Sequence, residues 1–443
     1  MVVDAGCEKV TAGAGPRQRA PGSASMRRVR RRVVITGAGV VSPLGAGVGP
    51  FWDALAQGRS GVDVLEMEAV GAIPAFPVTE GEDARERFGQ RDARRMDRSG
   101  RLAAVAAALA IEDAGEPDVP PERIGVSIGS VHGGAETLLE AHRALLERGP
   151  DRVSPFAIPS SLANHPCAAA ARTLGLRGPS SATATACAAG ADAIGAALGM
   201  IREGRADMVI AGGSDAPLSP LVVAGYIRVG ALNHDPGDVE RASRPFDRSR
   251  EGFVIGEGAG LLVLEEREHA LARGARIHAE LAGYGSSCDA GHPTDPDPTG
   301  EGPARAIAEA LDEAGLTTED VDYVNAHATS TPAGDLAESR ALVRAGLAGA
   351  TVSSTKSAHG HALGAAGGIE AVATLMAFTR DLIPATLNLE DPDPEAPFDH
   401  VLTPRPARVN AAISNSFGFG GHNACLAFIR HDEDAEEEDP AGP

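Results

Sequence analysis

One cysteine stands in surroundings that suit a nucleophile. Cys187 lies in TATACAAGADAIGAALG, where small residues precede an amphipathic pattern that begins just beyond the cysteine. The spacing predicts a strand-to-helix turn with Cys187 at or near the helix N-terminus. There the helix dipole and free backbone N–H groups favour thiolate over thiol and lower the pKa of the cysteine. Because the same N–H groups can hold an oxyanion, we expect thioester chemistry.

The other cysteines lack such surroundings. We interpret Cys167 and Cys425 as buried, inert thiols, and Cys7 and Cys288 have no visible partners. None of the five cysteines has CxxC spacing, which argues against a zinc site and against a disulfide framework. A reducing, cytoplasmic setting is therefore expected.

Two loops of small and hydroxyl residues carry basic side chains. His327 ends an apolar strand in VNAHATSTPAGD, and SSTKSAHGHALGAAGGIE holds Lys356, His359 and His361. A lone histidine of this kind is more often a structural hydrogen-bonding residue. Two neutral imidazoles, however, could donate to the enolate oxygen that forms when a malonyl thioester loses CO2. Lys356 nearby would help to keep them neutral, whereas His359 receives no assignment.

Lysine is almost absent from the chain. Of 40 Lys and Arg residues, only Lys9 and Lys356 are lysine, which indicates a coding bias towards arginine. Lys356 is therefore expected where a compact ammonium is required and a guanidinium would not serve.

A glycine-rich turn, SNSFGFGGHNA, spans residues 414–424 between two strands. It lacks the GxxxxGK[ST] spacing and the following helix of a phosphate-binding loop. Its glycines would let the backbone approach a substrate closely, with Phe417 and Phe419 capping a tunnel. A hydrophobic plug is the alternative interpretation of the two phenylalanines.

These residues need elements to position them, and the apolar pattern predicts an α/β protein with buried sheets. The first set of expected strands comprises RRVVITGAGVVSPLG, RIGVSIGS, ADMVIAGGSD and GFVIGEGAGLLVLEE, with helices at FWDALAQG and RSGRLAAVAAALAIEDAG. The second set comprises strands ARIHAELAGYG, VDYVNAHATST, ATVSST, RVNAAISNS and NACLAFIR, with helices PARAIAEALDEAG and GGIEAVATLMAFTR. Both sets follow one plan, which predicts a duplicated unit with the active site at the seam.

Four regions follow from this division. We expect a disordered extension over 1–27, in which Met26 could be the true start, and a half over 28–275 that holds the nucleophile. A second half over 276–430 holds the two histidines, and 431–443 is an acidic, disordered tail.

Charge and hydropathy limit the partners. The formal net charge of −21 disfavours nucleic acid as the main partner. No apolar run approaches the roughly 20 residues that a membrane-spanning helix requires. Neither nucleic acid nor a membrane is therefore expected, and an acidic partner would need a local basic patch.

Four separated signatures, TACAAG, VNAHATSTPAGD, SSTKSAHGHALGAAGGIE and NSFGFGGHN, occur in order. Through them the chain resembles the elongating type II β-ketoacyl-acyl-carrier-protein synthases, over roughly residues 30 to 430. The resemblance implies a thiolase-like fold of five layers, α-β-α-β-α, with two duplicated halves that acts as a dimer. It also implies ping-pong condensation, in which malonyl-carrier protein loses CO2 and its carbanion attacks a chain held on the enzyme.

The resemblance implies a role for each matching residue. Cys187 would be acylated, His327 and His361 would promote decarboxylation, and Lys356 and Glu338 would form a supporting polar network. The backbone N–H groups of Cys187 and Phe419 would form the oxyanion hole, with Phe419 also gating the acyl tunnel. The remaining matches are Thr329 and Thr331 at the phosphopantetheine arm, and Asn325, Glu370 and Ser414 at a buried Na+ or K+ site seen in some relatives. A plain hydrogen-bond network is the alternative at the latter, and no other cofactor is expected.

Carrier proteins of this system are acidic, which would give the basic run RFGQRDARRMDRSGR a purpose. Arg91, Arg94 and Arg95 match positions that the resemblance implies for carrier docking, and we expect them, together with Arg152, to form a docking patch for acyl- and malonyl-loaded carrier protein. A solvated helix face is the alternative.

Three positions depart from the family pattern. Ala328 stands where many relatives carry glycine. In GSVHGG, Val131 and His132 fall at the acyl pocket, where fatty-acid elongators usually place an aliphatic wall at the His132 position. Ala157 falls where a phenylalanine commonly reaches across the dimer. The last two changes suggest a pocket reshaped away from a plain saturated chain.

Three alternatives remain beside fatty-acid elongation. One is a polyketide or polyene ketosynthase that pairs with an inactive chain-length-factor homologue instead of forming a homodimer. Another is the non-catalytic partner itself, which the presence of Cys187, His327 and His361 disfavours. A CoA-dependent thiolase or a chain-initiating synthase resembles a Cys-His-Cys or Cys-His-Asn arrangement, and His361 occupies the third place here.

Overall fold

The computed structural model describes residues 31–79 and 84–431. The predicted N-terminal extension and all of the predicted acidic tail beyond residue 431 lie outside the described residues. Among the helices described, none is both long and apolar enough to cross a bilayer.

The first half of the chain forms five adjoining strands of one large sheet. Their order is β6-β5-β7-β8-β1, with β5 parallel to β6 and β7, and β8 antiparallel to β7 and β1. The strands are β1 (Val33–Ser42), β5 (Ile124–Gly129), β6 (Ser180–Thr183), β7 (Met208–Asp215) and β8 (Gly258–Glu266).

The second half repeats this arrangement. Its order is β11-β10-β15-β16-β9. Here β10 is parallel to β11 and β15, and β16 is antiparallel to β15 and β9, which is the pattern of the first half. The strands are β9 (Ala279–Cys288), β10 (Tyr323–Asn325), β11 (Thr351–Ser353), β15 (Ala411–Gly418) and β16 (His422–Ile429). The predicted duplication is therefore confirmed in strand order and direction. The halves meet where Val34 and Ile35 of β1 pair with Glu280 and Ala279 of β9.

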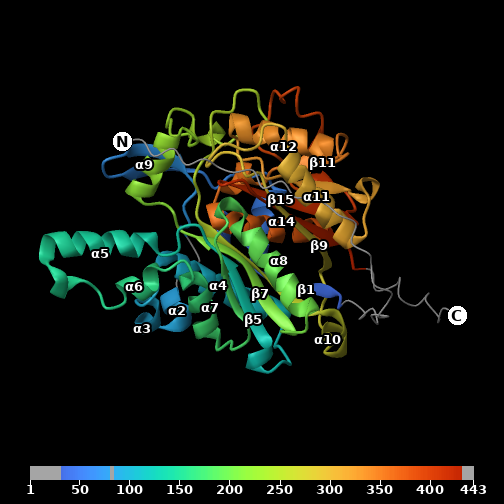
Figure 1. Ribbon diagram of the computed structural model, residues 1–443. Coiled ribbons are helices and arrows are strands. Elements are labelled where there is room, and N and C mark those ends of the chain that lie inside the picture. The colour runs from blue at the N-terminus through green and yellow to red at the C-terminus, as the bar shows by residue number, and fades with distance from the viewer. Residues whose placement is uncertain (1–30, 80–83, 432–443) are drawn as a thin grey trace, which may run out of the picture. The chain divides into compact units, whose positions relative to one another are not determined.

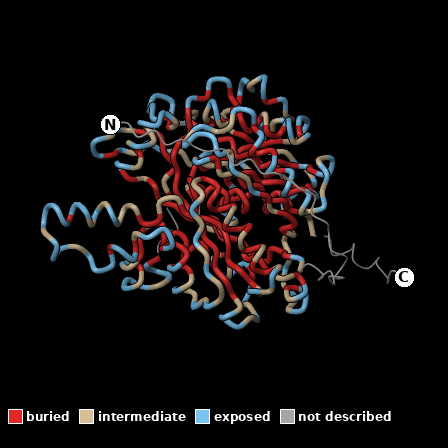
Figure 2. The backbone as a smooth tube through the Cα atoms, viewed as in Figure 1, coloured by how far each residue is buried: buried red, intermediate tan, exposed pale blue. Residues whose placement is uncertain are grey.

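Helices complete five layers, as the resemblance implied. On the outer face of the first half lie α4 (Arg98–Ala114) and α7 (His165–Leu174), and on that of the second lies α11 (Glu301–Ala314), against which α12 (Pro332–Arg344) packs. Between the halves lie α8 (Ala189–Arg202) and α14 (Ala366–Arg380), each of which contacts strands of both. Figure 1 shows α8 and α14 among the strands, and Figure 2 shows that the buried backbone is concentrated there.

The remaining elements are short or peripheral. Figure 1 shows α5 and α6 extending away from the sheet. The bounds are β2 (Gly45–Ala46), α1 (Val48–Ala56), β3 (Asp63–Met67), β4 (Gly71–Ala75), α2 (Ala84–Phe88), α3 (Gln90–Ala93), α5 (Ala135–Arg148), α6 (Ala157–Ser161), α9 (Pro220–Val229), α10 (Arg267–Ala272), α13 (Lys356–His359), β12 (Leu382–Ile383), β13 (Asp399–His400) and β14 (Arg405–Pro406).

Three predicted segments differ from the structure. The strand expected from residue 252 begins at Gly258, because residues 253–256 form only single bridges to three separate segments. The strand expected to run through residue 331 ends at Asn325, since the N–H groups of His327 and Ala328 bond to a side chain instead. The lysine and histidine loop begins with the short helix α13.

Glycines allow the central helix α14 to lie against β7 and β8. A Cβ on Gly260 of β8 would come 2.3 Å from the backbone nitrogen of Ile369, and one on Gly368 would come 2.2 Å from the carbonyl oxygen of Gly260. Because α14 is covered on both sides, its sequence is apolar almost all round. Backbone contact of this closeness fixes the spacing between helix and sheet.

We predict that Gly260→Ala destabilises the protein by about 1–3 kcal/mol, because the added methyl group forces backbone apart. Gly199→Ala is the matched control. Gly199 lies inside α8 with nothing within 4 Å of its Cβ position, so alanine should stabilise that helix by up to about 1 kcal/mol. Urea unfolding of both variants measures the effect, and equal shifts in the same direction would contradict the packing argument.

Candidate active site

The nucleophile candidate lies in a tight turn between β6 and α8. A 3-10 turn over Ala186–Ala188 joins them, and α8 begins at Ala189. Ala186 adopts a φ of 51°, in the left-handed region that alanine rarely occupies. Cys187 is 9% exposed. The predicted strand-to-helix turn is confirmed.

Two backbone donors reach the Cys187 thiol. The N–H groups of Phe419 and of Cys187 itself face its sulfur and lower the pKa of the thiol. These are the two groups that were expected to form an oxyanion hole. Gly418 makes their approach possible, because a Cβ there would come 2.9 Å from the Cys187 nitrogen.

The pKa of the Cys187 thiol is raised to about 12. Burial is the largest cause, and it outweighs the attraction of Lys356 and the two backbone hydrogen bonds. The sequence-based expectation of a lowered pKa is therefore wrong, because it considered the helix terminus without the burial. The resting site holds a neutral thiol, and acylation requires a group that takes up its proton.

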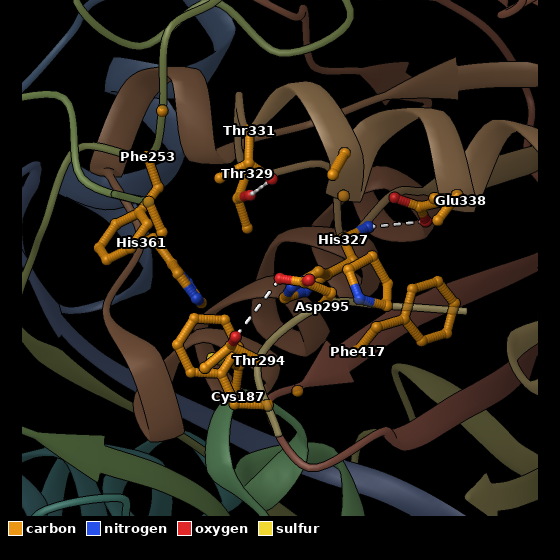
Figure 3. A pocket seen from close by; sticks show the side chains of 18 of the residues that line it. Cys187, Phe253, Thr294, Asp295, His327, Thr329, Thr331, Glu338, His361 and Phe417 are labelled. Atoms are coloured by element: carbon orange, nitrogen blue, oxygen red, sulfur yellow. Dashed lines mark hydrogen bonds between the residues drawn. The ribbon is translucent and has the colours of Figure 1, made fainter. Parts of the chain in front are cut away.

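Two histidine rings face the same cavity as Cys187. His327 follows β10, and His361 lies between α13 and α14 in a single bridge with Ile255. The ring centroids are 5.4 Å apart, with the planes at 85°. Figure 3 shows both rings extending into the cavity, with Cys187 at the end of α8 below them.

Both histidines are neutral at physiological pH. The pKa of His327 and that of His361 lie well below the ordinary value, first because of burial and second because of the positive charge on Lys356. This direction was predicted from the sequence. A neutral imidazole carries one N–H donor and one acceptor nitrogen, so each ring can hold a developing negative charge or accept a proton.

Two buried carboxylates divide the supporting contacts. Lys356, which is 1% exposed, forms an ion pair with Glu370. Glu338 instead accepts from the N–H groups of His327 at 2.9 Å and Ala328 at 2.6 Å, and from Asn415 Nδ2 at 3.0 Å. Glu338 thus fixes the loop that carries His327 (Figure 3), while Glu370 pairs with the ammonium group of Lys356.

The cavity has a volume of about 350 Å3. Thr329 and Thr331 line it, with their hydroxyl oxygens 3.0 Å apart, and so do Phe419 and Glu338. Sequence reasoning missed several lining residues because they come from segments without a recognised motif: Tyr226 on α9, and Phe253, Asp289, Thr294 and Asp295.

Three expected pocket residues do not line this cavity. Val131 packs against the apolar cluster that includes Cys187, Phe253 and Leu363. His132 contacts a residue that lines the cavity, because its Nε2 lies 3.2 Å from the hydroxyl of Tyr226. Ala157 is buried at the start of α6, away from the cavity lining.

His359, which sequence reasoning left unassigned, has a structural position. Its Nδ1 lies 3.0 Å from the carbonyl oxygen of Gly360, and its Nε2 lies 3.1 Å from Thr355 Oγ1. Because both ring nitrogens are occupied, His359 is not available to a substrate.

The expected cation site contains buried oxygens without hydrogen-bond partners. They are Asn325 Oδ1, Ser414 Oγ and the carboxylate oxygens of Glu370. Asn325 and Ser414 are register partners on β10 and β15, and Asn325 Nδ2 donates to the carbonyl oxygen of Glu370 at 3.4 Å. Oxygens of this kind suit a monovalent cation, although Glu370 also pairs with Lys356.

The expected docking arginines lie at the surface around α3 and the turn before α6. Arg91, Arg94 and Arg152 are exposed, and Arg95 stacks over the ring of Phe156 at 5.1 Å. Arg98, the next arginine in the run, instead forms an ion pair with Glu257 at 2.7 Å.

Comparisons with known proteins agree along the chain. The model of the β-ketoacyl synthase N-terminal domain matches residues 30–270, and that of the C-terminal domain matches residues 278–390. The chain is 46% identical over 413 residues to 3-oxoacyl-[acyl-carrier-protein] synthase 2 of Synechocystis sp., covering 91% of this chain and 99% of the relative. The protein of the same name from Vibrio cholerae is 45% identical, with 90% and 99% covered.

Solved structures share the fold. The ishigamide ketosynthase/chain length factor is 37% identical with a TM-score of 0.85, and a β-ketoacyl synthase from Burkholderia phymatum is 37% identical with a TM-score of 0.84. A type II polyketide ketosynthase, in complex with its acyl-carrier protein and bound to the hexaketide, is 34% identical with a TM-score of 0.82. Each match covers 91% of this chain and 100% of the other.

The five layers are thus a thiolase-like fold, and Cys187, His327 and His361 converge within it on one cavity. The chain belongs to the β-ketoacyl synthase family, as an acyl-transferring condensing enzyme of the 3-oxoacyl-[acyl-carrier-protein] synthase kind that elongates acyl chains.

Proposed function

We propose that Cys187 carries the growing acyl chain and that His327 and His361 drive decarboxylation of malonyl-carrier protein. The observation that carries this proposal is the pair of neutral imidazoles that share one cavity with the cysteine. A protonated imidazole could not accept a proton, and a distant one could not hold the enolate.

In the first half-reaction, the acyl thioester of the carrier protein exchanges onto Cys187. His361 takes the thiol proton, the sulfur–acyl bond forms, and the pantetheine thiol leaves with that proton. The N–H groups of Cys187 and Phe419 already converge on the sulfur. They can therefore hold the negative oxygen of the tetrahedral intermediate.

In the second half-reaction, malonyl-carrier protein occupies the cavity. Its bond to CO2 breaks, and the electron pair moves into the thioester to give an enolate whose oxygen the imidazole N–H groups hold. The enolate carbon then attacks the acyl carbonyl, and Cys187 leaves as a thiolate that takes up a proton from solvent. Burial of the cavity favours loss of the charged carboxylate as neutral CO2.

The proposed path for the substrate arm enters past Thr329 and Thr331. Their paired hydroxyls in the cavity wall suit the amide groups of phosphopantetheine. We propose that the carrier protein docks on Arg91, Arg94, Arg95 and Arg152, where exposed guanidinium groups can meet an acidic helix.

The acyl end of the pocket supports a polar or unsaturated chain, as in polyketide or polyene elongation. Tyr226 stands in the wall, edge-on to Phe253 at 5.4 Å, and His132 bonds to its hydroxyl from behind. A plain alkyl chain would offer no hydrogen bond to Tyr226 where it lines the cavity. Ala157 is small and Val131 is apolar. The polar pair of His132 and Tyr226 is therefore the feature that departs from an aliphatic wall.

The free edge of the sheet supports assembly into a dimer. Ser180 and Ala182 are exposed along β6, an end strand that carries neither charge nor proline. Unprotected edges of this kind pair readily with another chain. The partner proposed is a second copy or a chain-length-factor homologue, as the solved ketosynthase with its chain length factor illustrates for that protein.

Two further proposals concern the setting. The buried oxygens of Asn325, Ser414 and Glu370, the last of which also pairs with Lys356, would hold Na+ or K+, which would steady the strand ends below the histidines. Cys167, Cys187, Cys288 and Cys425 are free thiols, which supports work in the reducing cytoplasm.

To test the histidine roles, malonyl-carrier protein is offered to Cys187→Ala, which can decarboxylate but cannot be acylated. His327→Ala or His361→Ala in that background should slow CO2 release about 100-fold or more, since each removes a donor to the enolate. His142→Ala on the exposed face of α5 is the matched control and should change nothing.

The same assay has a predicted pH profile. Since burial and Lys356 hold the pKa of both histidines well below the ordinary value, protonation does not begin on lowering the pH from 8 to 6. Decarboxylation should therefore stay constant over that interval. A fall with a midpoint near 6.5, the pKa of a free imidazole, would overturn the assignment.

To test the acyl pocket, His132→Ile is combined with Tyr226→Phe to remove the polar pair while keeping its bulk. The variant should favour a saturated acyl-carrier protein over an oxygen-bearing one of equal length by about tenfold more than the wild type does. Competition between the two substrates measures kcat/KM directly. An unchanged ratio would exclude the pair as the selecting feature.

A further inference from the structure

A half-buried carboxylate ties the nucleophile turn to the second half of the molecule. Asp192, in the first turn of α8, accepts a hydrogen bond from the hydroxyl of Thr185, two residues before Cys187. Its other oxygen accepts from the hydroxyl of Tyr284 at 2.7 Å. Tyr284 lies on β9, so the chain of contacts crosses from one duplicated half to the other.

The packing around Tyr284 is built for this contact. Its ring lies directly against Gly195 of α8, where a Cβ would come 2.4 Å from Tyr284 Cδ2. Any side chain at that position would push the ring away from the helix and its hydroxyl away from Asp192. The glycine therefore lets the two halves meet at this point.

The turn that Asp192 holds has an unusual backbone. Thr185 has φ −115° and ψ 44°, and Ala186 follows with φ 51°. Non-glycine residues in such conformations cost about 1–3 kcal/mol each and persist only where their surroundings hold them. Gly418 holds the turn from the opposite side, since a Cβ there would come 2.9 Å from the carbonyl oxygen of Thr185.

The charge environment agrees with a structural link between these segments. Burial raises the pKa of Asp192, while the hydrogen bonds from Thr185 and Tyr284 and the nearby His422 oppose that rise. His422 is the register partner of Gly418 on β16. The strands beside Phe419 and the turn of Cys187 thus meet around one carboxylate.

We infer that Asp192 is a positioning residue, which sets the Cys187 sulfur against its two backbone donors and against the histidines through Thr185 and Tyr284. The inference rests on the proposed role of Cys187 as the acylated nucleophile. Cys187 belongs to the first half and both histidines to the second. A link that crosses the seam fixes one set relative to the other, and displacement of a reacting atom by about 1 Å can cost 100-fold in rate.

Two reactions separate positioning from general stability. The first is acylation of Cys187 by acyl-carrier protein under single turnover, and the second is decarboxylation of malonyl-carrier protein in the Cys187→Ala background. Thr185→Val and Tyr284→Phe each remove one hydroxyl and keep the shape of the side chain. Each should lower the acylation rate constant at saturating substrate at least tenfold with little change in KM, while decarboxylation stays within twofold.

A rescue variant and a double variant test the same link further. Thr185→Ser keeps the hydroxyl and should recover most of the acylation that Thr185→Val loses. The double variant Thr185→Val with Tyr284→Phe should lose less than the product of the single losses, since both act through Asp192. Tyr284→Phe alone reports on the link if Thr185→Val fails to fold.

The outcomes distinguish this inference from the function on which it rests. Unchanged acylation in Tyr284→Phe and Thr185→Val, or an equal loss in both reactions, would overturn the positioning role while leaving Cys187 as the nucleophile. Failure of the wild type to become acylated would overturn the proposed function, and the positioning role with it.

Discussion

The buried ammonium of Lys356 is the constraint on which the site depends. It lies beside two histidines that must remain neutral, and burial alone would leave the charge itself unstable. Glu370 compensates that charge, and both side chains are almost completely enclosed. Such a pair is costly to form from water, so its presence in the core agrees with the supporting role proposed for Lys356. Because lysine is otherwise nearly absent from the sequence, the requirement for an ammonium is visible even before the fold is known.

The duplicated architecture explains how the reacting groups meet. The first half places Cys187 just before the N-terminus of a central helix, α8, and the second half places His361 before the equivalent helix, α14. Both helices lie between the halves, and Cys187 and Leu363, which shortly precede their N-termini, line one cavity. Gly260 and Gly368 fix the distance between helix and sheet, and thereby the position of the segment that carries His361. The fold and the site therefore depend on the same close backbone contacts.

Local sequence motifs allowed much of the fold and of the active site to be predicted. The turn at Cys187 and the loop at His327 follow from short runs of small residues beside apolar strands, and the duplicated α/β plan follows from their periodicity. The raised pKa of Cys187 could not be predicted, because the residues that bury it, among them Phe253 and Leu363, are distant in sequence.

Contacts between residues far apart in the sequence were equally hidden. Tyr226 and Tyr284 belong to segments without a chemical motif, and their partners lie 94 and 92 residues away. The different contacts of Glu338 and Glu370 could also be assigned only from the fold. Only the folded arrangement distinguishes the carboxylate that holds a loop from the one that holds a cation.

The central claim is that Cys187 accepts the acyl chain, and intact-mass analysis of the protein with a panel of acyl-carrier proteins tests it most directly. The wild type should gain the mass of one acyl group, whereas Cys187→Ala should gain none. If no chain adds to the wild type, or if one adds equally to the variant, the account is contradicted.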